Sequence, residues 1–317
     1  MPLILRTRLA PAAAYATPPA SGLAVHLSGA AAVRTTAGGL DIDPGLQPVE
    51  PNHYLETWFT PGTATPERHG PLQLVEHDDV LFAAWQGPGA GLRANTRRAY
   101  RELLAACRER GFEHPARIWN YFGDIHGEED GLERYQAFCI GRAEALEELE
   151  IPLGSMPAAT AIGTDHPDLF IYLIATRQPA TAIENPRQVS AYHYPERYSP
   201  KSPGFARATR LDTADGPLLL ISGTASIVGH ESRHPGDVAA QTRETLANLR
   251  AVHEAAGRDL PGPAWLRVYL RHAADRPVVA GILGDHYRDT HPSPVVQWAR
   301  GDVCREELLV EIEGVHA

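Results

Sequence analysis

The order in which strands and helices are expected along this 317-residue chain is the feature that most constrains its fold. The spacing of apolar residues predicts a strand, a long helix, a strand, a second helix and two further strands within residues 79–176. Residues 218–315 repeat that order. The repetition predicts an α/β (α+β) fold of two tandem modules, over 1–180 and 181–317, each a mixed β-sheet packed against two helices.

The last two strands of each half follow each other closely in the sequence. They are expected at 158–164 and 168–176 in the first half, and at 294–301 and 307–315 in the second half. We expect each pair to form a β-hairpin, because adjacent strands joined by a short connection usually pair with each other.

Two glutamates share one face of the final predicted strand. Side chains alternate along a strand, so Glu311 and Glu313 point the same way. When the final strands of the two halves are aligned, Tyr172 corresponds to Glu311 and Ile174 to Glu313, so only the second half has carboxylates there. Two interpretations stay open: the glutamates keep an edge strand soluble, or Glu311 is a general acid whose pKa is raised in a pocket.

An arginine interrupts the apolar face of the helix expected over about 130–150. Arg142 lies four residues after Phe138 and four before Leu146, which places all three on one face. Its guanidinium must extend to solvent, pair with a buried carboxylate, or bind an anionic ligand, because an unpaired buried charge is costly.

The segment between the halves, residues 185–209, is rich in Tyr, Arg and Pro and has no helical period. It is either a surface loop or the wall of a pocket for a planar ring that bears carboxylates. The residues concerned are Tyr192, Tyr194, Tyr198, Arg187, Arg197 and Arg207.

Charge and cysteine content narrow the class of protein. The chain has 29 Lys and Arg against 39 Asp and Glu, a net charge of −10, which argues against a nucleic-acid partner. An anionic ligand would need arginines placed locally. We expect no membrane segment, no signal peptide and a cytoplasmic location. The three cysteines and the histidines show no metal-binding spacing, so no metal is expected.

Four stretches resemble the chorismatase family, over roughly residues 50–317. They are RIWNYFGDIHGEEDGLERYQAFCIGRAEAL, SAYHYPERYSPKSPGFARAT, ISGTASIVGHESRHPGDVAAQTRETLANLRA and CREELLVEIEGV. The C-terminal half by itself is also similar to the imine deaminase (YjgF-like) superfamily, in PGFARA, ISG, the helix GDVAAQTRETLANLRAV and VEIEGV. The resemblance implies two tandem YjgF/chorismate-mutase-like modules.

The resemblance also implies an activity, the cleavage of chorismate to pyruvate and a ring acid without metal or cofactor. Arg142 and Arg207 would bind the substrate carboxylates, and Tyr198 would contribute a hydroxyl. The backbone at Gly223 would border the ring. Glu311 would protonate the methylene carbon of the enol ether.

The resemblance implies Cys304 as a second catalytic residue beside Glu311, with packing as a small hydrophobic residue as the open alternative. Product choice within the family is expected to depend on small residues in the pocket, here Cys304 and the substrate-binding residue Ala225. A thiol at 304 favours 3-hydroxybenzoate, alone or together with 4-hydroxybenzoate, over the alternative, hydrolysis to a dihydroxycyclohexadienoate. Other classes also stay open. One is a non-catalytic binding protein for aromatic acids, and the other an imine hydrolase, disfavoured because Val296 stands where that superfamily has an arginine. A monomer is plausible because two modules per chain can bury their own interface.

Overall fold

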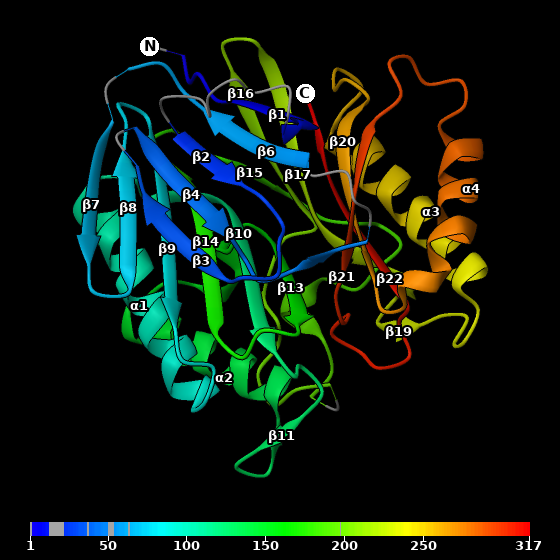
Figure 1. The fold of residues 1–317 in the computed structure, drawn as a ribbon, viewed down its shortest axis with the longest axis horizontal. Coiled ribbons are helices and arrows are strands. Elements are labelled where there is room, and N and C mark those ends of the chain that lie inside the picture. Colours follow the sequence, from blue (N-terminus) through cyan, green and yellow to red (C-terminus); the bar gives the residue numbers. More distant parts are fainter. Residues whose placement is uncertain (1, 13–21, 37, 50–53, 63, 197) are drawn as a thin grey trace.

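The computed structural model describes residues 2–12, 22–36, 38–49, 54–62, 64–196 and 198–317, and its strands form three main sheets (Figure 1). The sheet orders are β1-β6-β2-β4-β3, β13-β10-β14-β9-β8-β7 and β15-β16-β17-β22-β20-β21-β5, with two small hairpins, β11-β12 and β18-β19. The strands are β1 Arg6–Pro11, β2 Gly22–Val25, β3 Ala32–Thr35, β4 Gly39–Asp43, β5 Gln47–Pro48, β6 Tyr54–Phe59, β7 Thr65–His69, β8 Leu72–Glu76, β9 Val80–Gly87, β10 His114–Gly123, β11 Glu128–Glu129, β12 Leu132–Glu133, β13 Ala158–Thr164, β14 Leu169–Thr176, β15 Thr181–Ile183, β16 Ala208–Thr213, β17 Gly216–Ala225, β18 Ile227–Val228, β19 Glu231–Ser232, β20 Pro263–Leu270, β21 Val295–Arg300 and β22 Val310–His316. The α-helices are α1 Leu92–Glu109, α2 Arg134–Glu148, α3 Val238–Ala256 and α4 Arg276–His286.

The two larger sheets share one topology. In the six-stranded sheet β14 lies between β9 and β10, and β13 runs parallel to β10. In the seven-stranded sheet β22 lies between β17 and β20, and β21 runs parallel to β20. The predicted α+β fold of two related modules is therefore confirmed. The two predicted hairpins are wrong, because β10 separates β13 from β14 and β20 separates β21 from β22.

A matching irregularity in the two sheets fixes their alignment. The register of β10 shifts after Pro115, and that of β20 shifts after Pro263. With these bulges aligned, Tyr172 corresponds to Glu313, so the alignment drawn from the sequence is two residues out of register. The conclusion that only the second module carries carboxylates here is unaffected, because aromatic residues occupy both corresponding positions of the first module.

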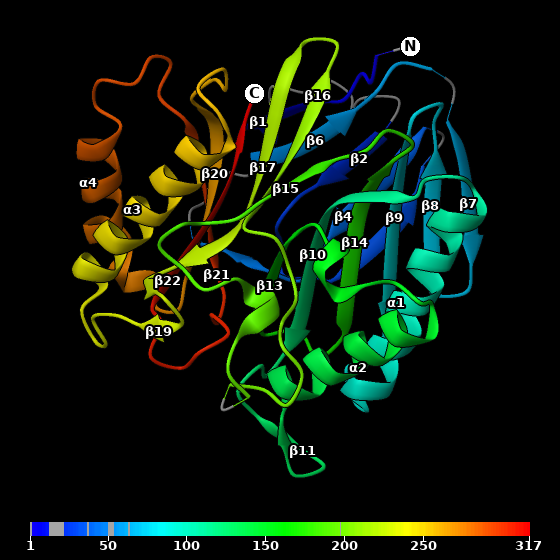
Figure 2. The same cartoon turned by 180° about the vertical axis from the view of Figure 1, so that it is seen from behind.

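The helices cover the outer faces of the two larger sheets. Figures 1 and 2 place α1 and α2 on one flank of the molecule and α3 and α4 on the other. Helix α2 begins at Arg134, later than expected, because residues 128–133 form the β11-β12 hairpin. Its turn residues Asp130 and Gly131 both have positive φ, which an Asp-Gly pair favours in tight hairpins. None of the helices in the described ranges is long and apolar enough to cross a membrane.

The first 59 residues contribute a five-stranded sheet that the sequence analysis did not predict. This sheet and the inner faces of the two larger sheets enclose one apolar core. Trp58 of the small sheet lies 6.2 Å from both Trp119 and Trp265, one from each module, measured between ring centroids. Tyr121 and Tyr269, which occupy corresponding positions in the modules, share a hydrogen bond of 2.9 Å. The modules therefore meet across a buried interface that is closed within one chain.

Candidate active site

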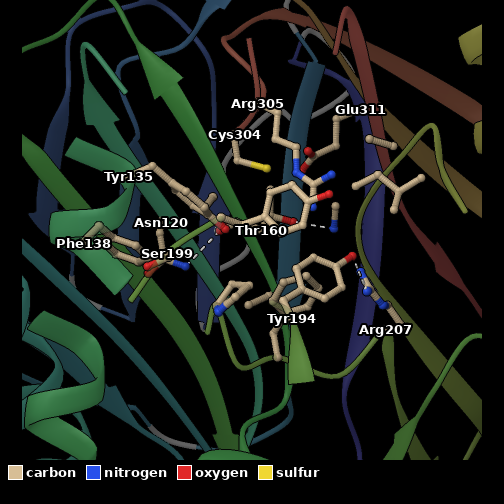
Figure 3. A pocket seen from close by; sticks show the side chains of 18 of the residues that line it. Asn120, Tyr135, Phe138, Thr160, Tyr194, Ser199, Arg207, Cys304, Arg305 and Glu311 are labelled. Atoms are coloured by element: carbon tan, nitrogen blue, oxygen red, sulfur yellow. Dashed lines mark hydrogen bonds between the residues drawn. The ribbon is translucent and has the colours of Figure 1, made fainter. Parts of the chain in front are cut away.

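A cavity that is partly open to solvent lies where the two modules meet (Figure 3). Helix α2 and strands β10 and β13 of the N-terminal module form one wall, with Tyr135, Phe138 and Asn120 on that side. Strands β17 and β22 and the loop between β21 and β22 form the opposite wall. The segment 188–207 between the modules completes the lining.

Glu311 lies on β22, a central strand, so the interpretation of an edge strand is wrong. The residue lines the cavity and is only 5% exposed. Burial raises the pKa of its carboxyl to about 8, the charge of Glu313 acts in the same direction, and Arg117 and Arg207 oppose the change. At neutral pH the carboxyl is therefore largely protonated and is able to donate a proton into the cavity.

Glu313, two residues further along β22, is buried in a different environment. Its carboxylate accepts hydrogen bonds from Thr160 Oγ1 (2.6 Å), Arg117 Nη2 (2.7 Å), Trp119 Nε1 (3.1 Å) and Arg267 Nη1 (3.2 Å). Two guanidinium groups and two further donors compensate its charge. The two glutamates are thus distinct, and Glu311 is the one that faces the cavity.

Arg142 is buried on α2 and lines the cavity. Its guanidinium packs over the rings of Phe138 and Tyr100, at 5.4 Å and 5.9 Å from their centroids. Among the described residues, no acceptor bonds its Nε or Nη2 and no carboxylate pairs with it. Extension to solvent and pairing with a buried carboxylate are both excluded, which leaves an anionic ligand as the interpretation to test.

Arg207, just before β16, is a second buried arginine in the lining. Its Nη2 donates to the Tyr194 hydroxyl (2.8 Å) and to the carbonyl of Val189 (3.0 Å). Its Nε has no acceptor within the described part of the chain. Figure 3 shows Tyr194 and Arg207 together on the side of the cavity opposite Tyr135. Both buried arginines therefore keep donor capacity at the site.

Tyr198 is held at the cavity by stacking and a hydrogen bond. The Arg305 guanidinium lies 3.8 Å from the centroid of its ring, and its hydroxyl lies 3.3 Å from His230 Nδ1. Arg305 in turn donates to the carbonyl of His230 (2.9 Å) and to Ser232 Oγ (3.1 Å). This arrangement fixes an aromatic ring and a third positive charge at the lining.

Three small residues surround the acid. Gly223 leaves room for the carboxyl, since a Cβ there would lie 1.9 Å from Glu311 Oε1. Ala225 is the cross-strand partner of Glu311. Cys304 also lines the cavity, and burial raises the pKa of its thiol to about 12, so it stays protonated at neutral pH.

All the site residues expected from the sequence line this one cavity. They are Arg142, Tyr198, Arg207, Gly223, Ala225, Cys304 and Glu311. Other residues of the segment 185–209 have different positions. The Tyr192 hydroxyl donates to the carbonyl of Met156, and Arg187 pairs with Glu244, while Arg197 lies outside the described residues.

Comparisons with known proteins identify the family of this chain. The family model "Chorismatase FkbO/Hyg5-like, N-terminal" matches residues 56–175. A 3-hydroxybenzoate synthase of Streptomyces hygroscopicus is 37% identical over 87% of this chain and 84% of its own length. The chain belongs to the chorismatase family. A chorismatase of Streptomyces rapamycinicus is likewise 37% identical, over 84% of each chain. A solved chorismatase structure covers 100% of this chain and 99% of its own, with a TM-score of 0.89 and 29% identity.

Asn120, Arg305 and Thr160 are among the lining residues of this chorismatase that were not found from its sequence. Asn120 interrupts an apolar strand, which is a usable signal, and it accepts a hydrogen bond from the Tyr100 hydroxyl (2.8 Å). Arg305 directly follows Cys304, so proximity alone could have indicated it. Thr160 gives no signal, because a β-branched residue is ordinary in a strand.

Proposed function

We propose that this protein cleaves chorismate to pyruvate and 3-hydroxybenzoate. The observation that carries the proposal is the pairing, in one cavity, of a buried, protonated Glu311 with two buried arginines that keep unused donors. The name of one relative, 3-hydroxybenzoate synthase, supports the choice of product.

The charges of the cavity suit a dianion that carries a ring. Chorismate has two carboxylates, one on the ring and one on the enolpyruvyl group. Arg142 and Arg207 would each bind one of them through the nitrogens that have no acceptor among the described residues. The rings of Tyr194, Tyr198 and Phe138 would pack against the substrate ring.

Glu311 would begin the reaction by proton transfer. The π electrons of the enol ether take the Glu311 proton at the methylene carbon, which becomes a methyl group. The adjacent carbon becomes an oxocarbenium ion, and the newly formed Glu311 carboxylate stabilises its positive charge. Glu311 therefore acts first as an acid and then as a counter-ion.

The following steps decide the product. In the route to 3-hydroxybenzoate, the oxygen of the ring's own hydroxyl bonds to the adjacent ring carbon that carries the ether, while the bond from that carbon to the ether oxygen breaks and pyruvate leaves with the ether oxygen. The hydroxyl oxygen then gives up its bond to its original carbon, and loss of the proton from the carbon that it now occupies completes the aromatic ring. Chorismate then has the same atoms as pyruvate and hydroxybenzoate together, and the lost proton restores Glu311. If water adds instead, the products are pyruvate and a dihydroxycyclohexadienoate. Ala225 and Cys304, beside Glu311, are the residues placed to affect this choice.

The test is to incubate the purified protein with chorismate, follow pyruvate with lactate dehydrogenase, and identify the ring product by NMR. Pyruvate with 3-hydroxybenzoate is the expected result. Pyruvate with a dihydroxycyclohexadienoate would contradict the proposed product but would still support the cleavage of chorismate. If chorismate binds tightly and stays unchanged, the proposed activity is wrong and the protein is a ligand-binding protein.

Glu311→Gln supplies the mechanistic control, because it keeps the shape of the side chain and removes the acidic proton. We expect it to lose most pyruvate release, by roughly 1,000-fold or more. Glu113→Gln, the same change at an exposed position, should leave the rate unchanged. A Glu311→Gln protein that retains the wild-type rate would exclude Glu311 as the acid.

A further inference from the structure

The hydroxyl of Thr160 links the two modules beside Glu311. Thr160 lies on β13 of the N-terminal module and is 2% exposed. Its Oγ1 donates to Glu313 Oε2 (2.6 Å) and accepts from Arg117 Nη2 (2.5 Å) and from the backbone N–H of Gly223 (2.9 Å). One donor and two acceptor positions are all that a threonine hydroxyl has, so its capacity is fully used.

The hydrogen bond between Thr160 and the Gly223 N–H holds a stretch of backbone that lies against the Glu311 carboxyl. Strand β17 has a register shift between Ile221 and Thr224, and Gly223 lies inside it. At this bulge the Gly223 backbone lies against the Glu311 carboxyl, as the 1.9 Å separation from a hypothetical Cβ shows. Bulges lack the regular ladder bonds that fix a strand, so an external bond has more influence on their position.

The direction of each bond at Thr160 follows from its neighbours. Glu313 and Arg117 are both buried and form an ion pair of 2.7 Å, so the Thr160 proton must point to the carboxylate. The guanidinium takes one lone pair. The remaining lone pair is then directed to the Gly223 N–H. Glu313 therefore fixes the orientation of the hydroxyl that holds Gly223.

We propose that Thr160, oriented by Glu313, is a positioning residue that holds the Gly223 bulge, and through it the Glu311 carboxyl, in the geometry that proton transfer needs. Figure 3 shows Thr160 at the centre of the lining, between Asn120 and Glu311. Thr160 makes no proton transfer itself. The expected change in rate rests on the proposed function. The expected displacement of Gly223 and Glu311 does not depend on it.

The kinetic test compares Thr160→Val, which keeps the shape, with Thr160→Ser, which keeps the hydroxyl. A displacement of about 1 Å at a reacting group costs on the order of 100-fold in rate, so we expect Thr160→Val to lower kcat roughly 10- to 100-fold. We expect KM to change by less than about threefold, and Thr160→Ser to recover kcat to within about threefold of the wild type. Thr176→Val is the matched control, since Thr176 is buried in β14 and its hydroxyl donates only to backbone carbonyls.

A Thr160→Val enzyme with a wild-type kcat would overturn the proposal. So would an equal loss in Thr160→Ser, because the hydroxyl would then be irrelevant. Crystal structures of the wild type and of Thr160→Val separate this result from the proposed function. We expect the Gly223 bulge and the Glu311 carboxyl to move by about 1 Å. If Gly223 and Glu311 superpose in the two crystal structures, the positioning role is refuted, whether or not the wild type releases pyruvate. If the wild type releases no pyruvate but the two residues move, only the proposed function is refuted.

Discussion

Replacing Glu311 with glutamine is expected to stabilise the protein while it removes the activity. The carboxyl has a pKa of about 8 in the folded chain, against 4.5 ordinarily, and the residue is 5% exposed. Between these pH values the unfolded chain has lost the Glu311 proton and the folded chain has kept it. Each unit of pH increase therefore lowers the free energy of unfolding by about 1.4 kcal/mol.

The magnitude follows from that slope. The contribution of Glu311 to the free energy of unfolding is most favourable below pH 4.5. That contribution falls as the pH rises and reaches its lowest value above about pH 8. Relative to a residue that stays neutral, Glu311 should lower the free energy of unfolding by about 3 kcal/mol at pH 7 and by about 5 kcal/mol above pH 8. Glutamine has a similar shape and no proton to lose. The stability gained by Glu311→Gln should therefore grow steadily across this range.

Urea denaturation of both proteins, followed by tryptophan fluorescence, measures the gain at steps of roughly one unit from about pH 5 to about pH 8. Glu113→Gln controls for the loss of one negative charge at an exposed site. A difference between Glu311→Gln and the wild type that stays constant with pH would refute the reasoning, because it would mean that Glu311 has the same protonation in the folded and unfolded chains.

Three kinetic results are also expected. The rate of pyruvate release at saturating chorismate should fall as pH rises through about 8, because Glu311 must carry its proton to act; a rate that rises in a pH series over this range would contradict that role. Arg142→Met keeps an unbranched apolar stem and removes the charged guanidinium, so KM should increase by roughly 100-fold, as when one partner of a buried charge pair is removed, and an unchanged KM would exclude Arg142 from binding. Cys304→Ala should release pyruvate within about tenfold of the wild-type rate, because the raised pKa of the half-buried thiol, about 12, keeps it un-ionised at neutral pH; complete loss in the coupled assay would show that the thiol takes part.

Arg142 shows how far a local pattern can predict a site. Helical periodicity placed it on the apolar face of its helix, and the cost of burying a charge limited its possible partners to a few. Glu311 was found in the same way, from strand alternation, although its neighbours in the sheet were not. In both cases the chemistry of one side chain conflicts with its own local surroundings, and such a conflict is visible in the sequence.

The features that were missed depend on contacts between distant parts of the chain. The order of strands was mispredicted because β10 and β20 each insert between two strands that are neighbours in the sequence. The partners of Glu313 are equally remote, since Thr160 and Arg117 lie 153 and 196 residues away from it. No periodicity within a window of the sequence contains that information, so the environment that separates Glu313 from Glu311 required the structure.

The net charge of −10 and the proposed dianionic substrate are compatible because of the protonation of Glu311. Salt screens distant surface charges within about 8 Å at physiological ionic strength, so the groups that line the cavity decide binding there. Those groups include Arg142, Arg207 and Arg305, and Glu311 is the acidic residue among them. An ionised Glu311 would offset one arginine and repel a substrate carboxylate. The burial that keeps the proton on the acid therefore also preserves the positive charge that would bind the substrate, and opening the cavity to water should weaken proton donation and anion binding together.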